Sequence, residues 1–519
     1  MKTIAITGAT GNMGNKVVEE LLKNPYLKLK ILALDEKKDR KLLSKWAKKF
    51  PDRLEYAFGN VANYSDCFRL CYDADYLVNM AAVIPPQADH DHEKSSEANL
   101  LGVQNIVKAV EKQKKDLKLI HISSVAIYGY RNENHPWGRV GDPLLPSAYD
   151  VYGMAKLMGE RAVLNSDISK WVILRQTGIL YEKLLMNNVS DGLMFHTCFN
   201  SPIEWVTDSD SAILIRKIIE SDLKEELKDF WKKIYNIGGG ENYRTTGFES
   251  FDIGFSLIGG NAKMFLEPCW QAQRNFHCIW FEDSSILQDR FDYQNGSFNE
   301  FWLSILDKHP YFALAKFLPK SIIKSLVFKR LLKNTNAPFY WVKNNDEGRI
   351  SAFYGSRLTY EKAKRGWSEI KLFCKNQVGT VPYIESLDKS KIIEHGFRLD
   401  HGFDENKPIE DIDIDDCKKA AEFRGGKCLS ESMVKGDLYT KLAWQCSEGH
   451  IFYASPYAVL FGGHWCEKCL DVYRWDFDYL SKKNPFYYQV WFDSHSTDEN
   501  NVYYFDENGK SKIELGETL

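Results

Sequence analysis

The chain has 519 residues, of which 44% are hydrophobic and 14% aromatic, and its formal net charge is −3. This length and composition allow large buried cores and predict two or three domains. No apolar run is long enough to cross a bilayer and a first strand is expected from residue 2, so we predict a soluble, cytoplasmic protein without a leader.

A glycine-rich turn follows the first predicted strand, which covers residues 2–6. The turn reads Thr7-Gly8-Ala9-Thr10-Gly11-Asn12-Met13-Gly14, and a helix with one apolar side is expected from about Asn12. Strand, glycine turn and helix in this order form the context in which such a turn binds a dinucleotide. Gly8 permits the tight turn, Gly11 lets the backbone approach a pyrophosphate, and Gly14 allows close packing. The predicted cofactor-binding residues of the turn are Gly8, Thr10, Gly11, Asn12, Met13 and Gly14.

An acidic residue ends the second predicted strand, which covers residues 29–34. Asp35 lies about 20 residues beyond the last glycine, where a carboxylate can accept a hydrogen bond from the 2′-hydroxyl of an adenosine ribose. This position favours NAD as the cofactor. Lys37, Lys38 and Arg40 follow directly and could hold a 2′-phosphate instead, so NADP stays open as the alternative.

Four further motifs follow in the order Asn79-Met80-Ala81-Ala82, Ala98-Asn99-Leu100-Leu101-Gly102-Val103-Gln104-Asn105, Ser123-Ser124-Val125-Ala126-Ile127-Tyr128-Gly129 and Tyr152-Gly153-Met154-Ala155-Lys156. With the glycine turn, they resemble the extended branch of the short-chain dehydrogenase/reductase superfamily, the NAD-dependent epimerase/dehydratase family, over residues 1–245. The resemblance implies an α/β fold with a Rossmann-type, doubly wound parallel sheet and a smaller substrate-binding part from residue 178. Predicted cofactor contacts outside the turn are Asp35, Asn60, Val61, Ala81, Ala82, Tyr152 and Lys156.

Tyr152 and Lys156 are spaced for acid–base chemistry on one face of a helix. A tyrosine is a poor base near neutral pH, because its pKa is ordinarily about 10. Lys156 lies one turn away, and its ammonium, with the positive charge of oxidised nicotinamide, favours the phenolate. Tyr152 can then take a hydroxyl proton while hydride leaves for the cofactor, or return the proton in the reverse direction. Ser124, after a strand expected over residues 118–123, would bind the substrate oxygen.

The resemblance also implies that Lys156 grips the nicotinamide ribose and that Asn99 supports this lysine through a water. The predicted catalytic residues are therefore Ser124, Tyr152, Lys156 and Asn99.

Two departures from the family pattern narrow the reaction. Sugar 4,6-dehydratases of this branch carry Thr-Asp-Glu where this chain has Ser124-Val125-Ala126, so the acid and base that eliminate water are absent. Gly178 stands where the epimerases usually carry an asparagine that helps to bind a nucleotide diphosphate. The first departure disfavours a dehydratase, and the second argues against a sugar nucleotide as substrate.

Two aromatic-rich segments beyond residue 178 are candidates for the substrate side. They are residues 191–205, with Phe195, His196, Phe199 and Trp205, and residues 267–281, with Trp270, Arg274, Phe276, His277 and Trp280. They either line a pocket with a few orienting polar groups or pack as an ordinary core under a lid. We expect both histidines to be structural rather than catalytic.

Residues 246–416 are expected to extend the substrate lobe and to form a helical or mixed connecting region. Within it, residues 319–333 have apolar positions at helical spacing, with lysines at 320, 324, 329 and 333. Such a helix commonly packs on a domain with its lysines in solvent; the alternative is that it lies on an anionic membrane. The acidic stretch of residues 405–416 is expected to be a surface linker.

Four cysteines near the C-terminus have the spacing of zinc ligands: Cys428, Cys446, Cys466 and Cys469. The last two form a Cys-x-x-Cys knuckle that offers two thiolates from one turn, and soft thiolates suit tetrahedral zinc. The pattern resembles a zinc-ribbon or treble-clef module over residues 417–470, so residues 417–519 are expected to form a C-terminal α+β domain with structural Zn²⁺. His450 or His464 could replace one cysteine, although packing or supporting hydrogen bonds are the commoner roles.

Charge indicates whether this module should bind nucleic acid. Residues 401–519 contain 13 Lys and Arg against 22 Asp and Glu, a net charge of −9. An acidic surface is poorly suited to phosphate backbones, so nucleic-acid binding is disfavoured. We expect the zinc to stabilise the fold or a protein contact.

Together these patterns predict an NAD(P)-dependent oxidoreductase that acts on a small-molecule substrate by hydride transfer at a secondary alcohol or ketone, either as a dehydrogenase/reductase or as a sugar-type epimerase. The alternative is a non-catalytic, nicotinamide-binding sensor or scaffold with a zinc-ribbon interaction module. Retention of Ser124, Tyr152 and Lys156 favours the enzyme, because a sensor has no need of the proton-transfer set. Relatives often pair helices into dimers, so the resemblance leaves a homodimer open.

Overall fold

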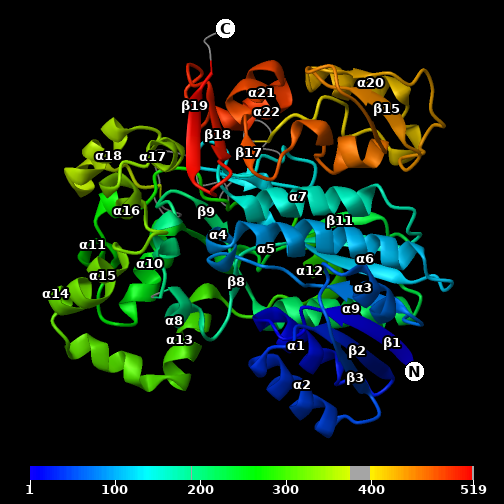
Figure 1. The fold of residues 1–519 in the computed structure, drawn as a ribbon, viewed down its shortest axis with the longest axis horizontal. Coiled ribbons are helices and arrows are strands. Elements are labelled where there is room, and N and C mark those ends of the chain that lie inside the picture. The colour runs from blue at the N-terminus through cyan, green and yellow to red at the C-terminus, as the bar shows by residue number, and fades with distance from the viewer. Residues whose placement is uncertain (189, 374–397, 517–519) are drawn as a thin grey trace.

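A seven-stranded parallel sheet lies at the centre of the computed structural model, which describes residues 1–188, 190–373 and 398–516 (Figure 1). Its order is β11-β7-β5-β4-β1-β2-β3, so the chain winds outward in both directions from β1 and β4, as in a doubly wound fold. This confirms the predicted fold class. The strands are β1 (Lys2–Thr7), β2 (Leu27–Ala33), β3 (Leu54–Phe58), β4 (Tyr76–Asn79), β5 (Lys118–Ser124), β7 (Trp171–Gln176) and β11 (Lys233–Ile237).

Helices cover both faces of the sheet. One apolar core includes side chains from α1 (Asn12–Leu21), α2 (Lys37–Lys49) and α9 (Asp208–Leu223); the other includes α3 (Tyr64–Cys71), α6 (Gly102–Glu111) and α7 (Val151–Leu164). Because successive side chains of a strand point to opposite faces, Ile4 and Ile6 of β1 join the first core and Ala5 joins the second. The central strands β4 and β7 are buried at every position, whereas the edge strand β3 is buried only at Leu54.

The elements that position the site begin and end close to their predicted bounds. The first strand ends at Thr7, one residue after its predicted end, and α1 starts at Asn12, as expected. The second strand ends at Ala33, one residue before the predicted end, and β5 ends at Ser124, one residue after it.

Short strands and helices follow the sheet. Two short helices precede α6, namely α4 (Gln87–His90) and α5 (His92–Ser96). The paired strands are β6 (Trp137–Gly138) with β13 (Trp280–Phe281), β8 (Ile179–Leu180) with β10 (Val206–Thr207), and β9 (Pro202–Glu204) with β12 (Arg244–Thr246). The later helices are α8 (Leu184–Asn188), α10 (Gly247–Ser256), α11 (Ala262–Phe265), α12 (Ser285–Phe291), α13 (Phe298–Lys308), α16 (Pro338–Lys343), α17 (Glu347–Tyr354) and α18 (Arg357–Lys364).

The helix expected over residues 319–333 is present in three parts. These are α14 (Lys320–Ile323), a π-helical stretch (Lys324–Phe328) and α15 (Lys329–Leu331), which lie at the left of Figure 1. Among the described residues, no helix has both the length and the apolar character that a bilayer span requires.

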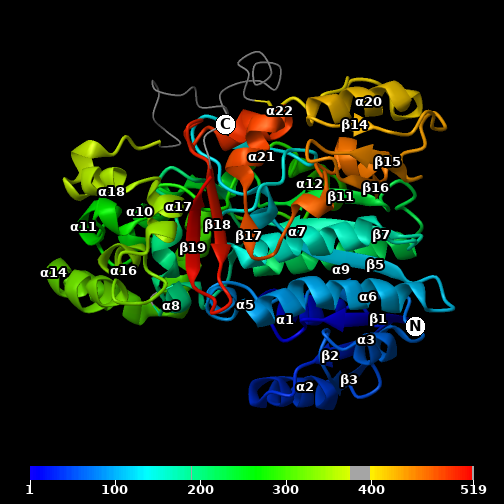
Figure 2. The same cartoon turned by 45° about the horizontal axis from the view of Figure 1, so that its top comes forward.

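The C-terminal part lies over α7, as Figure 2 shows. It contains one sheet of β14 (Lys427–Cys428), β15 (Leu442–Gln445) and β16 (Ile451–Ala454), a second of β17 (Arg474–Trp475), β18 (Asn501–Phe505) and β19 (Ser511–Leu515), and helices α20 (Ile414–Phe423), α21 (Phe477–Lys483) and α22 (Pro485–Trp491). Trp444, Trp465 and Trp475 belong to the same apolar core as α6 and α7. The division of the chain into separate domains stays a prediction, because this core runs from the central sheet into the C-terminal part.

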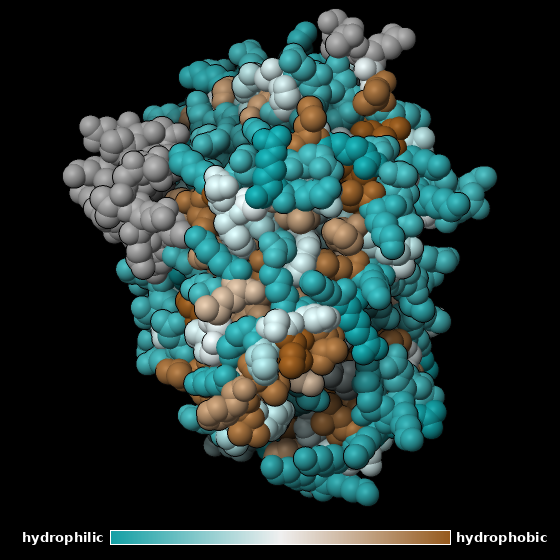
Figure 3. Space-filling view, turned by 90° about the vertical axis from the view of Figure 1, so that its left-hand side faces the viewer, coloured by the Kyte–Doolittle hydropathy of each residue, from teal (hydrophilic) through white to brown (hydrophobic). Residues whose placement is uncertain are grey.

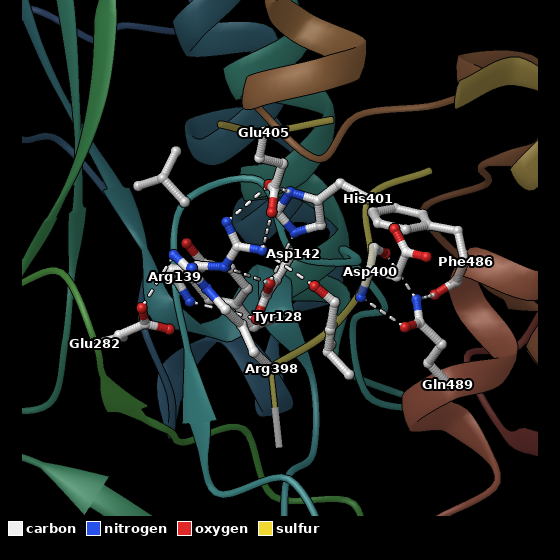
Figure 4. A network of polar contacts seen from close by, with 12 residues as sticks. Tyr128, Arg139, Asp142, Glu282, Arg398, Asp400, His401, Glu405, Phe486 and Gln489 are labelled. Atoms are coloured by element: carbon white, nitrogen blue, oxygen red, sulfur yellow. Dashed lines mark hydrogen bonds and ion pairs between the residues drawn. The ribbon is translucent and has the colours of Figure 1, made fainter. Parts of the chain in front are cut away.

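A network of polar contacts connects residues 398–405 to the loop between β5 and α7 (Figure 4). Arg139 donates hydrogen bonds to both carboxylate oxygens of Glu405, at 2.8 and 2.7 Å, and His401 Nε2 lies 3.0 Å from Asp142 Oδ1. Burial raises the pKa of the Asp142 carboxyl, but His401 and the charge of Arg131 outweigh it and hold the pKa below its usual value. The predicted surface linker therefore begins at a residue that is bound to the core.

Candidate functional site

The glycine turn has the shape that a dinucleotide requires. Gly8 has φ of +69°, and a β-carbon there would lie 2.6 Å from the carbonyl carbon of Met80. A β-carbon on Gly14 would lie 2.1 Å from the carbonyl oxygen of Gly8, so neither position admits a larger residue. Gly11 has one such neighbour, Gly8 O at 3.4 Å, and no side chain caps the first amides of α1. Open amides at a helix N-terminus suit a phosphate, so these residues fit a dinucleotide.

Asp35 lies two residues beyond the end of β2, and its carboxylate already has a partner. Arg40 donates to Asp35 from Nε at 2.5 Å and from Nη2 at 2.6 Å, and both side chains are at the surface. Binding of a ribose hydroxyl by Asp35 would compete with this ion pair. Because Arg40 is also placed to meet a 2′-phosphate, the geometry keeps both NAD and NADP open.

The other predicted cofactor residues lie at the carboxyl ends of neighbouring strands. Asn60 and Val61 follow β3, and Ala81 and Ala82 follow β4. The amide of Ala81 donates to Thr7 Oγ1 at 3.1 Å, which ties the ends of β4 and β1 together. This is the edge at which open α/β sheets bind their ligands.

Ser124 and Tyr152 meet where β5 ends and α7 begins. Burial raises the pKa of Tyr152 to about 12, while a hydrogen bond with Ser124 lowers it and the charge of Asp150 raises it. Asp150 caps α7 by accepting a hydrogen bond of 2.8 Å from the amide of Gly153. In this environment Tyr152 is a protonated phenol, which can donate to a substrate oxygen.

Lys156 is buried one turn along α7 from Tyr152. Its ammonium donates to the carbonyl of Ile122 at 2.5 Å, and burial lowers its pKa to about 8 although the charge of Glu160 raises it. Glu160 lies a further turn along the helix, 2.6 Å from Arg175 Nη2. The structure thus places a buried anion beside the buried cation of the predicted catalytic set.

Asn99 is fully buried in a π-helical turn, Glu97–Leu101. Its amide nitrogen donates to Val83 O at 2.8 Å and to Ser95 Oγ at 3.2 Å. Its oxygen has no hydrogen-bond partner among the described residues. Buried acceptors usually have a partner, so this oxygen can accept a hydrogen bond from a water. The predicted role of Asn99 beside Lys156 stays a prediction.

A pocket opens beside the start of α7. Its lining includes Asp150, His277, Phe276, Trp341 and Arg349. His277 Nδ1 lies 3.0 Å from Asp150 Oδ2, and the Arg349 guanidinium lies over the Trp341 ring at 4.8 Å. Within the described parts of the chain, Arg349 Nε is a buried donor without a hydrogen-bond partner. The pocket therefore combines aromatic walls with a cation and a carboxylate.

The two aromatic-rich segments contribute to this pocket only in part. His196, Phe276 and His277 line it, and His196 Nε2 is held by the carbonyl of Asn336 at 2.7 Å. The remaining predicted residues pack in the core or make polar contacts elsewhere. They are Phe195, Phe199, Trp205, Trp270, Arg274 and Trp280. Both alternatives for these segments, pocket wall and packed core, therefore apply to different side chains.

Three of the four predicted zinc cysteines come together, and a histidine completes the cluster. Ligand atoms of Cys446, His450, Cys466 and Cys469 all lie within 4.8 Å of one another. The sulfurs of Cys446 and Cys469 are 3.7 Å apart, and His450 Nδ1 is 3.4 Å from Cys469 Sγ and 3.8 Å from Cys466 Sγ. Cys428 is on β14, opposite Trp444, and is not in this group.

These separations fit a tetrahedral zinc ion. Ideal bond lengths place two sulfur ligands about 3.8 Å apart, and a sulfur and a nitrogen ligand about 3.6 Å apart. The cysteines are free thiols, so no disulfide explains their approach. The residue set is chemically suited to zinc because it offers three soft sulfurs and one imidazole.

The segment with the Cys-x-x-Cys knuckle packs directly on α7. Arg161 Nη2 donates to Tyr453 O at 3.2 Å, and its Nε lies 3.3 Å from a carboxylate oxygen of Glu467, between the two knuckle cysteines. His464 Nε2 lies 2.9 Å from Glu160 Oε1. The metal-ligand cluster and the catalytic candidates are therefore connected through one helix.

Sequence reasoning did not single out three residues that matter in this geometry: Asp150, Glu160 and Arg349. A signal existed for Glu160, because an acid four residues after Lys156 lies on the same helical face. Asp150 precedes α7 as a typical capping residue. Arg349 carries no local signal, since it reaches the pocket through tertiary packing.

Residues 4–176, about a third of the chain, match the model of the NAD dependent epimerase/dehydratase family. A UDP-glucose 4-epimerase of Rickettsia bellii (strain OSU 85-389) is 30% identical over 132 residues, which are 24% of this chain and 38% of that relative. The chain thus spans well under half the length of this curated relative. The matching segment includes the glycine turn, Ser124, Tyr152 and Lys156.

Solved structures with a similar arrangement include a UDP-glucuronic acid 4-epimerase from Bacillus cereus in complex with NAD. It is 19% identical, covers 60% of this chain and 98% of its own, and has a TM-score of 0.45. A dTDP-glucose 4,6-dehydratase from Bacillus anthracis, also in complex with NAD, is 17% identical over 60% of this chain and 98% of its own, with a TM-score of 0.46.

Replacing Lys156 with Met should raise the free energy of unfolding near neutral pH. The pKa of this lysine is about 8 in the folded protein against an ordinary 10.5, so the folded state disfavours the charged form. Below pH 8 this costs about 3 kcal/mol, and the cost fades as the pH rises from 8 to 10.5. Urea unfolding without added cofactor measures the difference.

The control is Lys41→Met on the exposed side of α2, which should leave stability unchanged. A Lys156→Met protein that is less stable than the wild type at pH 7 would show that burial of the ammonium is not a net cost.

Proposed function

We propose that the protein is an NAD(P)-dependent oxidoreductase that transfers hydride at a secondary alcohol or ketone, as a dehydrogenase/reductase or as a sugar-type epimerase. The observation that supports this most directly is the buried Lys156, which lies one helical turn from Tyr152 and donates to the carbonyl of Ile122 at 2.5 Å, on the strand that ends at Ser124. These groups lie at the sheet edge where the glycine turn leaves helix amides open.

Tyr152 is the acid or base of the proposed reaction. A bound nicotinamide supplies hydride exchange at the substrate carbon. The Tyr152 hydroxyl gives its proton to the substrate oxygen in reduction and takes it back in oxidation. Ser124 holds the same oxygen, because it ends the strand that leads to this edge of the sheet and Tyr152 is in the first turn of α7.

Lys156 and Glu160 set the charge around this proton. The Lys156 ammonium stabilises the phenolate that forms in reduction, and Glu160 keeps that ammonium protonated against its burial. Burial raises the pKa of Glu160 itself, but Arg175 and His464 outweigh this and hold it well below its usual range, so the carboxylate stays ionised.

The pocket beside Asp150 is the proposed entrance for the substrate. Asp150 both lines the pocket and caps the helix that carries Tyr152. Arg349 Nε lies 3.7 Å from Asp346 Oδ2 but makes no hydrogen bond, so it can donate one to an acidic or hydroxyl-bearing group, and Trp341 and Phe276 offer apolar walls. A small polar molecule with a secondary alcohol fits this combination.

The second candidate function is a nicotinamide-binding sensor or scaffold. It would use the glycine turn and the C-terminal module, but it gives no reason for a hydrogen-bonded serine and tyrosine beside a buried lysine. Burial of an ammonium is expensive, and such groups are characteristic of catalytic sites. The enzyme is therefore the better explanation of this site.

For the metal cluster, we propose one structural Zn²⁺ ion held by Cys446, His450, Cys466 and Cys469. The support is the tetrahedral spacing of the four ligand atoms. All four positions of the tetrahedron come from protein, which is typical of structural rather than catalytic zinc. The ion would hold the knuckle against Arg161 and so stabilise the contact with α7.

Tyr152→Phe should lower kcat by about a hundredfold or more, because the phenol ring stays but the transferable proton is lost. Cofactor affinity should change little, since the glycine turn is untouched. Steady-state kinetics on an identified alcohol or ketone, with cofactor binding by fluorescence, measure both quantities. Tyr26→Phe, at an exposed tyrosine, is the matched control. Undiminished turnover by Tyr152→Phe would exclude the proposed acid–base role.

Elemental analysis should find one zinc per chain, and His450→Ala should reduce this content while Cys428→Ser leaves it unchanged. The pair is informative because His450 lies in the cluster and Cys428 does not. Removal of zinc should also lower the thermal unfolding midpoint. Loss of zinc in Cys428→Ser with retention in His450→Ala would restore the four-cysteine set and contradict the proposed ligands.

A further inference from the structure

One stretch of the chain carries only positive charges. Residues 308–345 contain seven lysines and one arginine and no aspartate or glutamate. The whole chain has a net charge of −3, so this stretch differs in sign from the protein that surrounds it. A local excess of this size gives one face its own electrostatic field.

Apolar side chains are exposed along the same stretch. Phe317 is 85% exposed, Leu326 68% and Leu314 64%. The apolar members of this face are Tyr311, Leu314, Phe317, Leu318, Ile322 and Leu326, and we call them, with Lys316, Lys329, Arg330 and Lys333, the basic apolar face. Figure 3 views this end of the molecule and shows brown, apolar side chains gathered in its lower half among teal ones. Contiguous apolar exposure of this kind on a soluble protein usually marks a binding surface.

The part of this face that lies on residues 320–331 is firmly attached to the protein. Ile323, Phe328 and Leu331 point inward and are buried in the large core. The Phe328 ring packs edge-on against Phe255 at 5.2 Å. Residues 320–331 therefore have one side anchored to the protein and a second side, with Ile322 and Leu326, that nothing in the described chain covers. Leu314 and Phe317 lie on the 3-10 helix before it, Pro310–Phe317, which has no buried residue.

The four cations of the basic apolar face are free to meet an outside anion, unlike three neighbouring lysines of residues 308–345. Lys308 pairs with Glu182 and Lys324 with Glu267, so these two are partly neutralised. Lys320 donates to backbone carbonyls, at 2.9 Å to that of Ile258. The four cations of the basic apolar face are exposed, and within residues 1–188, 190–373 and 398–516 they form no ion pair.

The charge pattern selects between candidate partners. A second copy of the chain on a twofold axis would place this cationic surface against itself, and like charges oppose such contact. A nucleic acid would use the cations but would leave Phe317, Leu314 and Leu326 exposed to its phosphates. An anionic bilayer satisfies both features, because its surface attracts lysines while its interior accepts apolar side chains.

We propose that the basic apolar face binds the surface of an anionic lipid bilayer. Phe317, Leu314 and Leu326 enter the boundary between headgroups and acyl chains, and Lys329, Arg330 and Lys333 contact the headgroup phosphates. The attachment is peripheral, with the helix lying along the surface. This inference is independent of the proposed catalytic chemistry.

Vesicle co-sedimentation of the full chain tests the proposal directly. The protein should sediment with vesicles of phosphatidylcholine containing about a third phosphatidylserine and stay in solution with phosphatidylcholine alone. High salt should weaken the binding, because the headgroup attraction is screened. A protein that does not sediment with the anionic vesicles overturns the proposal, and an acidic protein partner would then be the alternative for this face.

Two pairs of variants assign the binding to this face. Phe317→Ser with Leu326→Ser should weaken vesicle affinity about tenfold or more, whereas Val434→Ser, at a residue 74% exposed on the C-terminal part, should not. Lys329→Gln with Lys333→Gln should likewise weaken it, whereas Lys45→Gln with Lys48→Gln on α2 should not. Equal cofactor binding and thermal midpoints would show that all variants are folded. Wild-type vesicle affinity in both test variants would refute the proposal.

Discussion

A buried ion pair between Glu160 and Arg175 is the constraint on which the rest of the structure depends. Both side chains are fully buried, one on α7 and one on β7, and Arg175 also donates to Tyr128 Oη and Gly462 O, each at 2.7 Å. Charges so far from water are tolerated only when every partner is in place. Two of those partners, Gly462 and His464, come from the C-terminal part, so the central sheet and the C-terminal part must fold against each other.

This constraint also fixes the helix that carries the catalytic candidates. Helix α7 meets the sheet through Lys156, the ion pair through Glu160 and the metal-ligand segment through Arg161. A helix held on several sides gives Tyr152 and Ser124 a constant separation, which proton transfer requires. Burial of Lys156 lowers the stability of the folded protein. Proteins commonly retain such a destabilising residue where function needs it.

Short-range patterns were the part of the site that the sequence predicted well. The glycine turn, the Tyr152 and Lys156 spacing and the Cys466 and Cys469 knuckle each lie within one turn or one helix, where backbone geometry sets the distances. The doubly wound parallel sheet was implied by the family resemblance of five motifs, and the structure has this sheet. The later helices and the pocket had no such local signal, because their packing partners lie far away along the chain.

From the sequence, the family resemblance implied the doubly wound sheet, local spacing located the glycine turn, and the spacing of Tyr152 and Lys156 predicted the acid–base set, because turn and helix geometry act over a few residues. Tertiary structure alone decided that His450 lies with the three cysteine sulfurs and that Arg40 pairs with the carboxylate of Asp35. It also decided that the basic apolar face is exposed. It also brought His464 to Glu160 across 304 positions of the chain. Contacts of that range depend on how whole elements pack, and no local pattern of residues encodes that packing.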